Sequence, residues 1–237
     1  MDAIPAKVET LILGATCFGC GAAAALGAEN SLVLERTTVA GRDFALTFAP
    51  GRDRPEARLA PAAGELRREA VRRNALVGGR IQTAALSPLF ADWCIRRKLN
   101  LLFACDILEL GRNHAVFQAV DGLHTVEFAR LVDAEPSYRN GKYLTALVSA
   151  PVGEAAPAAR TAEFELVPVL PENRAALVMK LAAETEWSEA RRRLREAWSR
   201  RPEELASLKL LLSANEFFSG EYANAFSALS AGLEVAR

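Results

Sequence analysis

Two short apolar runs separated by small residues stand out near the start of the chain. Leu11 to Leu13 form the first run, which stops at Gly14. Ser31 to Leu34 form the second, which stops at Glu35. Unbroken apolar runs of this length are typical of strands buried on both faces of a parallel sheet. Ala22 to Ala25 predict a thin helix between them, able to lie close against the sheet.

Beyond residue 36 the pattern loosens and then changes its period. Residues 37–61 show little periodicity and are predicted to run over the surface. Two helices are expected at 64–76 and 85–98, followed by an apolar strand at 100–105. The period then falls to two in three short segments joined by turn residues. These segments predict a β-meander, and they lie at 106–110, 115–120 and 125–131.

The C-terminal half mixes further strands with two helices. Alternating β-formers predict strands at 143–149 and 162–170, on either side of an Ala/Pro/Gly-rich linker. A charged helix is predicted at 185–199, with Thr185 as its cap. An apolar strand is predicted at 208–212 and a last helix, with a stripe of small residues, at 222–236. The chain is therefore expected to be an α/β protein.

The turn between the first strand and the first helix carries the candidate chemistry. A dinucleotide-binding βαβ unit needs glycines for a tight turn, for close approach of a pyrophosphate and for helix packing. It also needs an acid about 20 residues later to bind a ribose. Here Gly14 and Gly19 take the first and third glycine positions, and Glu35 follows Gly14 by 21 positions. Thr16 replaces the second glycine, where its hydroxyl could bond a phosphate or its methyl group could block one.

Composition narrows the possible partners. The 237 residues can bury a core in one large or two small domains. Lys plus Arg and Asp plus Glu number 29 each, and zero net charge argues against a nucleic-acid partner bound through its phosphates. The apolar runs are too short to predict a membrane span, and residues 1–6 do not resemble a signal peptide. The spacing of His and Cys predicts no metal site. Four Cys without a secretory signal indicate reduced thiols in the cytoplasm.

Cys17 and Cys20 form a CxxC motif at the start of the first helix. Helix N-termini lower thiol pKa values, so one hypothesis is a dithiol redox protein. The alternative is that Cys is a small residue suited to close packing beside a phosphate turn. A helix start that holds a pyrophosphate cannot easily serve a disulfide as well, which favours the packing role. Cys94 and Cys105 are expected in the core.

The order of elements and the C-terminal sequence resemble the FAD-dependent oxidoreductases with a glutathione-reductase-type FAD domain. Their closing motif is a strand ending in Ala-Gly-Asp, followed by a helix with an Ala-Leu-x-x-Gly-x-x-Ala run. Residues 214–216 fall on the first part, and Ala228, Leu229, Gly232 and Ala236 fall on the helix. The resemblance implies an FAD/NAD(P)-binding Rossmann-type parallel sheet with a β-meander. It assigns 1–136 and 205–237 to that domain, and 137–204 to a reduced substrate or cap region.

Spacing and resemblance together nominate a set of cofactor-binding residues. They are Gly14, Ala15, Thr16, Cys17, Phe18, Gly19, Glu35, Arg36, Asp133, Ala134, Asn215 and Glu216. The resemblance places the adenosine ribose of FAD on Glu35 and the ribityl end near Glu216. The chain departs from the family at Thr16 and Asn215, and Glu135 would bring a negative charge toward the pyrophosphate. Catalytic residues are not identified, and His114 and His124 are expected to be structural residues of the meander.

The leading hypothesis is an FAD-dependent oxidoreductase, or the flavoprotein component of one, that transfers hydride between FAD and an unidentified organic substrate. The alternative is a flavin-free relative that serves as a subunit or scaffold. A dithiol redox protein and an NAD(P)-only binder come third. The cap region is too short to cover a flavin alone, and Trp187 and Trp198 share one helix face. A homo-oligomer or a second subunit is therefore expected.

Overall fold

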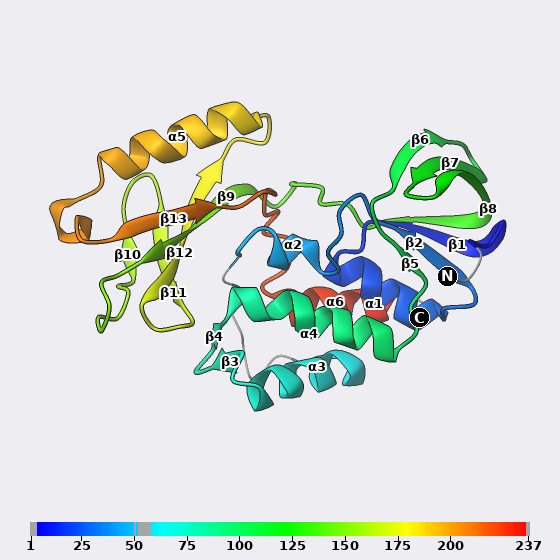
Figure 1. The fold of residues 1–237 in the computed structure, drawn as a ribbon, viewed down its shortest axis with the longest axis horizontal. Coiled ribbons are helices and arrows are strands. Elements are labelled where there is room, and N and C mark those ends of the chain that lie inside the picture. Colours follow the sequence, from blue (N-terminus) through cyan, green and yellow to red (C-terminus); the bar gives the residue numbers. More distant parts are fainter. Residues whose placement is uncertain (1–3, 50, 52–57, 236–237) are drawn as a thin grey trace.

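The computed structural model describes residues 4–49, 51 and 58–235 (Figure 1). In this part of the chain there are two sheets, of six and five strands, and one two-stranded hairpin. The elements are β1 (Lys7–Leu13), α1 (Cys17–Leu26), β2 (Ser31–Leu34), α2 (Arg42–Ala45), α3 (Pro61–Arg72), β3 (Leu76–Val77), β4 (Arg80–Ile81), α4 (Thr83–Arg96), β5 (Leu101–Leu102), β6 (Asp106–Leu110), β7 (His114–Ala119), β8 (Gly122–Asp133), β9 (Lys142–Ser149), β10 (Ala159–Arg160), β11 (Glu165–Val169), β12 (Arg174–Leu181), α5 (Trp187–Ser199), the 3-10 helix η1 (Glu203–Leu205), β13 (Lys209–Ser213) and α6 (Ala225–Leu233).

The first sheet joins a parallel part to an antiparallel meander. Its order is β5-β2-β1-β8-β7-β6, with β5, β2, β1 and β8 parallel. The long β8 pairs with β7 through its first half and with β1 through its second. Alternate residues of β1 point to opposite faces. Ile12 packs in the core made with α1, α4 and α6, whereas Leu11 and Leu13 pack beside Phe117 and Phe128 of the meander. The predicted Rossmann-type sheet with a meander is confirmed.

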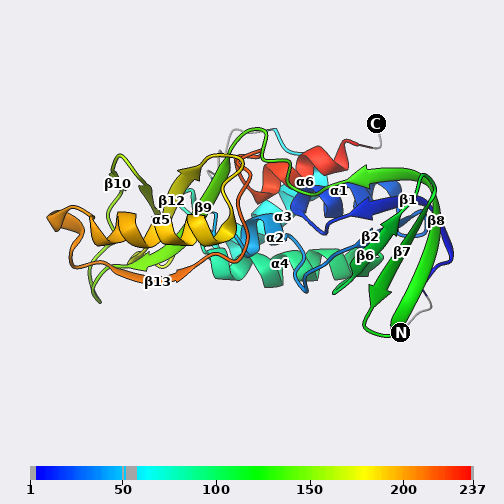
Figure 2. The ribbon, with the colours of Figure 1, turned by 90° about the horizontal axis from the view of Figure 1, so that it is seen from above.

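The second sheet, with α5 on one face, forms a lobe apart from the first sheet (Figures 1 and 2). Its strands are antiparallel in the order β10-β11-β12-β9-β13. The strand predicted at 208–212 was expected in the dinucleotide-binding domain, but β13 pairs with β9 in this second sheet. Strand β12, which lies between β9 and β11, was not predicted.

The segment expected to run over the surface, 37–61, contains a buried helix. Arg42 and Phe44 of α2 are 1% and 2% exposed, so that prediction is wrong for this part; residues 50 and 52–57 lie outside the described residues. The β3–β4 hairpin was not predicted. The cap of α5 is Glu186 rather than Thr185. No helix of the described residues has the length and apolar composition to cross a membrane.

Two glycines let α6 cross α1 in close contact. A Cβ atom on Gly21 would lie 2.4 Å from the carbonyl oxygen of Leu229. One on Gly232 would lie 2.0 Å from the carbonyl oxygen of Phe18. Backbone atoms cannot yield this much space locally, so both positions need glycine. The C-terminal helix is therefore held against the helix that follows the glycine turn.

We predict that Gly232→Ala lowers the free energy of unfolding by about 2 kcal/mol or more, because the added methyl group overpacks the contact with α1. Gly64→Ala is the matched control in α3, where the nearest atom to the new Cβ is the flexible end of Arg68 at 3.5 Å. It should be neutral or stabilise by about 0.5–1 kcal/mol. Urea unfolding measures both, and equal midpoints for the two variants would contradict the role of this contact.

Candidate functional site

The site is built around the N-terminus of α1, at the carboxyl edge of β1 and β2. Thr16 is the N-cap of α1, and its Oγ1 accepts a hydrogen bond from the Gly19 N–H at 3.0 Å. The same hydroxyl donates to the carbonyl oxygen of Ala134 at 3.1 Å. A Cβ on Gly19 would lie 2.2 Å from the Gly14 carbonyl oxygen, so the turn is as tight as the motif predicted. The Thr16 hydroxyl thus caps the helix within the chain.

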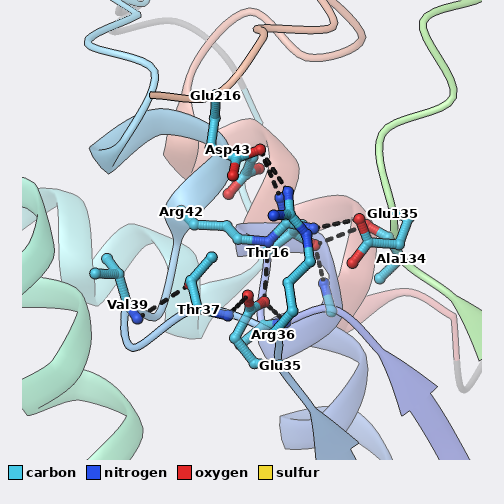
Figure 3. Close-up of polar contacts among 12 residues, drawn as sticks. Thr16, Glu35, Arg36, Thr37, Val39, Arg42, Asp43, Ala134, Glu135 and Glu216 are labelled. Atoms are coloured by element: carbon cyan, nitrogen blue, oxygen red, sulfur yellow. Dashed lines mark hydrogen bonds and ion pairs between the residues drawn. The ribbon is translucent and has the colours of Figure 1, made fainter. Parts of the chain in front are cut away.

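Glu35 is fully buried and ties three segments together. Its Oε2 accepts hydrogen bonds from the Ala15 N–H at 2.7 Å and from Arg42 Nε at 3.0 Å. Its Oε1 accepts from the Thr37 N–H at 2.7 Å. A buried carboxylate needs such partners to offset its lost hydration. The acid at the end of β2 is therefore held by the chain's own donors, as Figure 3 shows.

Arg42 collects three glutamates around one guanidinium (Figure 3). Besides Glu35, it pairs through Nη2 with Glu135 and through Nη1 with Glu216 at 3.4 Å. Burial lowers the pKa of Arg42, but the hydrogen bond to Glu135 and the charges of the glutamates outweigh this and hold that pKa above its ordinary value. The side chains of Arg42 and Glu35 are 1% and 0% exposed, so this pair forms with little screening by solvent, whereas the Glu135 side chain is 39% exposed.

The carboxylate of Glu135 rests against the first glycine of the turn. A Cβ atom on Gly14 would lie 2.8 Å from Glu135 Oε1. The Glu135 side chain is 39% exposed and pairs with Arg42. The Glu135 carboxylate thus occupies the space left by the absent side chain of Gly14, and it pairs there with the buried guanidinium of Arg42. The motif places a pyrophosphate at this same turn and helix start.

A second carboxylate occupies the helix N-terminus itself. Asp43 Oδ1 accepts a hydrogen bond from the Cys17 N–H at 2.8 Å. Burial raises the pKa of Asp43 to about 6, although the hydrogen bonds from Cys17 and the charge of Arg42 oppose the rise. Beside it lies a cavity of about 120 Å³, lined in part by Phe18, Glu135 and Tyr222. The N–H groups of Ala15, Cys17 and Gly19 all have acceptors from the chain.

The structure brings most of the nominated residues together at this edge. Three segments meet there: the turn that leads into α1, the end of β2 and the end of β8. Together they supply Gly14, Ala15, Thr16, Cys17, Gly19, Glu35, Asp133 and Ala134. Arg36 and Glu216 meet at 2.5 Å above it. Phe18 lines the cavity beside Asp43 and stacks on Tyr222, with ring centroids 6.1 Å apart. The Asn215 N–H donates to the Leu46 carbonyl oxygen at 3.3 Å.

Sequence reasoning missed Arg42 and Asp43. Both lie in the segment that lacked periodicity, and nothing in the pattern distinguishes Arg42 from the other arginines nearby. A buried charge is recognised only once its long-range partners are known. Glu135, by contrast, was noted from its position directly after Asp133-Ala134, the first of which ends β8.

The cysteines and histidines do not add a reactive group to this site. Cys17 and Cys20 are buried free thiols. The pKa of Cys17 is raised well above its ordinary value, mainly by burial and also by the charge of Asp43. The pKa of Cys20 is likewise raised, mainly by a hydrogen bond with Cys94 and also by burial. His114 and His124 lie on the meander, within 3.1 Å of Glu109 and 2.9 Å of Asp121. No cluster of three potential metal ligands occurs among the described residues.

Comparison with solved structures identifies the fold. No protein-family model and no curated protein sequence matches the chain. The L-proline dehydrogenase from P. horikoshii has a TM-score of 0.61 at 13% identity, over 98% of this chain and 93% of that chain. The chain has the FAD/NAD(P)-binding fold. The myxobacterial chondrochloren halogenase CndH, a variant of the FAD-dependent halogenases, has a TM-score of 0.57 at 13% identity, over 93% of this chain and 63% of that one.

A third neighbour is the p-nitrophenol 4-monooxygenase PnpA from Pseudomonas putida DLL-E4, with a TM-score of 0.55 at 11% identity. The match covers 88% of this chain and 67% of that chain. The chain therefore spans about two thirds of the length of the halogenase and the monooxygenase. CndH belongs to the FAD-dependent halogenases, and a flavoprotein/dehydrogenase from Cytophaga hutchinsonii also shares this fold, so the resemblance to FAD-dependent enzymes is confirmed for the fold alone. The glutathione-reductase-type subclass stays a prediction.

We predict that Arg42→Gln lowers the free energy of unfolding by about 3–5 kcal/mol, because it leaves the buried Glu35 carboxylate without its cation. Arg36→Gln is the matched control: it breaks a pair with Glu216 in which the Arg36 side chain is 49% exposed. Its cost should stay below about 1 kcal/mol. Chemical denaturation at neutral pH compares the two variants. Similar losses in the free energy of unfolding would show that the buried Arg42 pairs stabilise the fold no more than an exposed pair does.

Asp43→Asn should remove a pH dependence of stability. Because the carboxyl has a pKa of about 6 in the folded chain and an ordinary value of 3.8, the folded state holds its proton longer. The contribution of Asp43 to stability is therefore most favourable below about pH 4 and falls as pH rises to 6. The loss amounts to about 3 kcal/mol. Between pH 4 and pH 7, the free energy of unfolding of Asp43→Asn should rise relative to that of the wild type. A constant difference between the two proteins across this range would contradict the prediction.

Proposed function

We propose that the chain binds FAD at the N-terminus of α1 and acts as an oxidoreductase, or as the flavoprotein component of one. The observation that carries this proposal is the carboxylate of Glu135, which lies against Gly14 and on Arg42. Gly14 is the first glycine of the turn between β1 and α1, and in dinucleotide-binding folds this turn faces the pyrophosphate. In this chain an anion already sits there, so the cradle fits a negatively charged oxygen group.

The residues around the cradle fit the rest of a dinucleotide. Arg42 supplies a buried guanidinium, which suits bidentate pairing with phosphate oxygens. The N-terminus of α1 adds the positive end of the helix dipole. Glu35 stands at the end of β2, where the ribose acid of such folds lies. Glu216, which follows β13, would meet the ribityl end.

Loading the cofactor requires an exchange of anions. The Glu135 side chain is partly exposed and can turn into solvent, which leaves Arg42 to pair with the incoming phosphate. The pair between Arg36 and Glu216 would open to admit the ribose toward Glu35. The bound flavin would supply hydride transfer to or from an organic substrate. The chain's own part is to bind and orient the dinucleotide and to keep water from the buried carboxylates.

A flavin-free relative that serves as a subunit or scaffold is the second candidate. It is favoured by the internal pairing of the buried charges of the site, since Glu35 is fully buried with three donors. Arg42 likewise has three acidic partners. The cavity of about 120 Å³ beside Asp43 is smaller than the usual ligand pocket of about 300–1,000 Å³. In this case the fold would be kept without its cofactor.

The remaining hypotheses are less well supported. A dithiol redox function needs an accessible, low-pKa thiol, whereas the buried Cys17 and Cys20 have raised pKa values. Association with a second chain stays a prediction. Trp187 packs on Phe217 with ring centroids 4.4 Å apart, and Trp198 packs on Phe164 at 6.2 Å. Both rings are therefore partly used inside the chain.

We predict that Glu135→Gln tightens FAD binding about 10-fold or more, because the variant removes a competing anion and a like charge from the phosphate position. Glu221→Gln is the matched control: it removes the same charge from the rim of the same small cavity, where Glu221 is exposed and is not among the ion-pair partners of Arg42. Purified wild type and both variants are stripped of ligand and titrated with FAD, with flavin fluorescence as the readout.

Each outcome decides between the candidates. Yellow wild-type protein supports flavin binding, and FAD affinity that rises only in Glu135→Gln supports binding at this site. Equal affinity in all three proteins would remove Glu135 from the site but keep the cofactor. If neither the wild type nor either variant binds FAD while circular dichroism shows an intact fold, the flavin-free subunit or scaffold is the supported function.

A further inference from the structure

A second cavity lies between α3 and α4, which run side by side below the first sheet (Figure 1). Its volume is about 440 Å³, and it shares no lining residue with the site at Gly14. Residues three and four apart on a helix share one face. Accordingly, one face of α3 supplies Glu65, Leu66, Arg68, Glu69 and Arg72, and the end of α4 supplies Trp93, Arg96 and Arg97.

Buried donors without acceptors line this cavity. Trp93 is 2% exposed, yet its indole Nε1 has no hydrogen-bond partner. Nε of Arg97, whose guanidinium carbon lies 4.7 Å from the centre of the Trp93 ring, also lacks an acceptor. Buried donors in native proteins are nearly always satisfied, because an unmade hydrogen bond costs about 1–3 kcal/mol. Two such atoms on neighbouring side chains indicate a missing acceptor.

The charge of the cavity has the sign that suits such an acceptor. Four arginines and two glutamates line it, in a chain whose net charge is zero. Arg72 pairs with Glu69 and Arg97 with Glu65, and Arg96 reaches Asp92 at the rim. Arg68 makes no hydrogen bond or ion pair within the described part of the chain. A guanidinium, an indole N–H and a free Arg Nε–H therefore share one space.

We infer that this cavity binds a small molecule bearing an oxyanion, either a phosphate or a carboxylate group. The oxyanion accepts from Trp93 Nε1 and Arg97 Nε and pairs with Arg68. Arginine is well suited to both groups, because its planar fork matches their oxygens. The cavity volume is within the usual range for small-molecule sites, so the ligand carries an organic part besides its charged group. The Arg97 side chain lies over the Trp93 ring and moves as the oxyanion enters.

The indole N–H of Trp93 gives a direct test. The chain has three Trp, so a proton–nitrogen correlation spectrum has three indole signals, and Trp93→Phe identifies the one from Trp93. Inorganic phosphate and succinate are titrated separately at constant ionic strength, with chloride as the reference anion. A saturable shift of the Trp93 signal with one of them supports the site, and the tighter of the two tells phosphate from carboxylate ligands.

Arg68→Gln should weaken that binding about 10-fold, the loss expected for one charged contact. Because Arg68 is exposed and unpaired in the described structure, the variant should fold as the wild type does. Arg195→Gln on α5 is the control for loss of one exposed positive charge elsewhere, and its binding should be unchanged. The inference is overturned if neither anion moves the Trp93 signal, or if Arg68→Gln and Arg195→Gln bind alike.

Discussion

The buried pairing of Arg42 with Glu35 is the interaction on which the carboxyl edge of the first sheet depends. Glu35 receives the N–H of Ala15 from the turn after β1 and the N–H of Thr37 from the loop after β2. Arg42 carries the connection onward to Glu135 after β8 and to Glu216 after β13. One guanidinium therefore joins segments of both lobes, and each carboxylate it holds is costly to bury alone.

The sequence predicts those parts of the fold that have local signals. Gly14, Gly19 and the run from Ser31 to Leu34 mark a turn and a strand without reference to the rest of the chain, and β2 begins and ends where predicted. Strand β12 was missed because Arg174–Leu181 contains Ala, Leu, Met and Lys, which also favour helices. Pairing with β9 and β11 overrides that local preference.

The same reasoning explains what could be predicted of the site. Gly14, Thr16 and Glu35 follow a spacing that the chemistry of a phosphate turn imposes, so their meeting was foreseen. Arg42 could not be found, because its burial depends on acids 93 and 174 positions away in the sequence. The pairing of β13 with β9 likewise depends on a long-range contact and has no local signature. Long-range charge pairing is thus the main part of the site that one sequence leaves open.

Because the chain satisfies its own helix N-terminus, ligand binding there is an exchange rather than a simple addition. The free chain already has Asp43 on the N–H of Cys17 and Glu135 on Arg42, so a phosphate gains only the difference between its contacts and theirs. Such exchange lowers affinity but keeps the edge folded when the site holds no cofactor. A fold shared by dehydrogenases, halogenases and monooxygenases leaves function to these few side chains. Under the proposed function, the charge balance between Arg42 and its three glutamates would decide whether this copy of the fold takes a flavin.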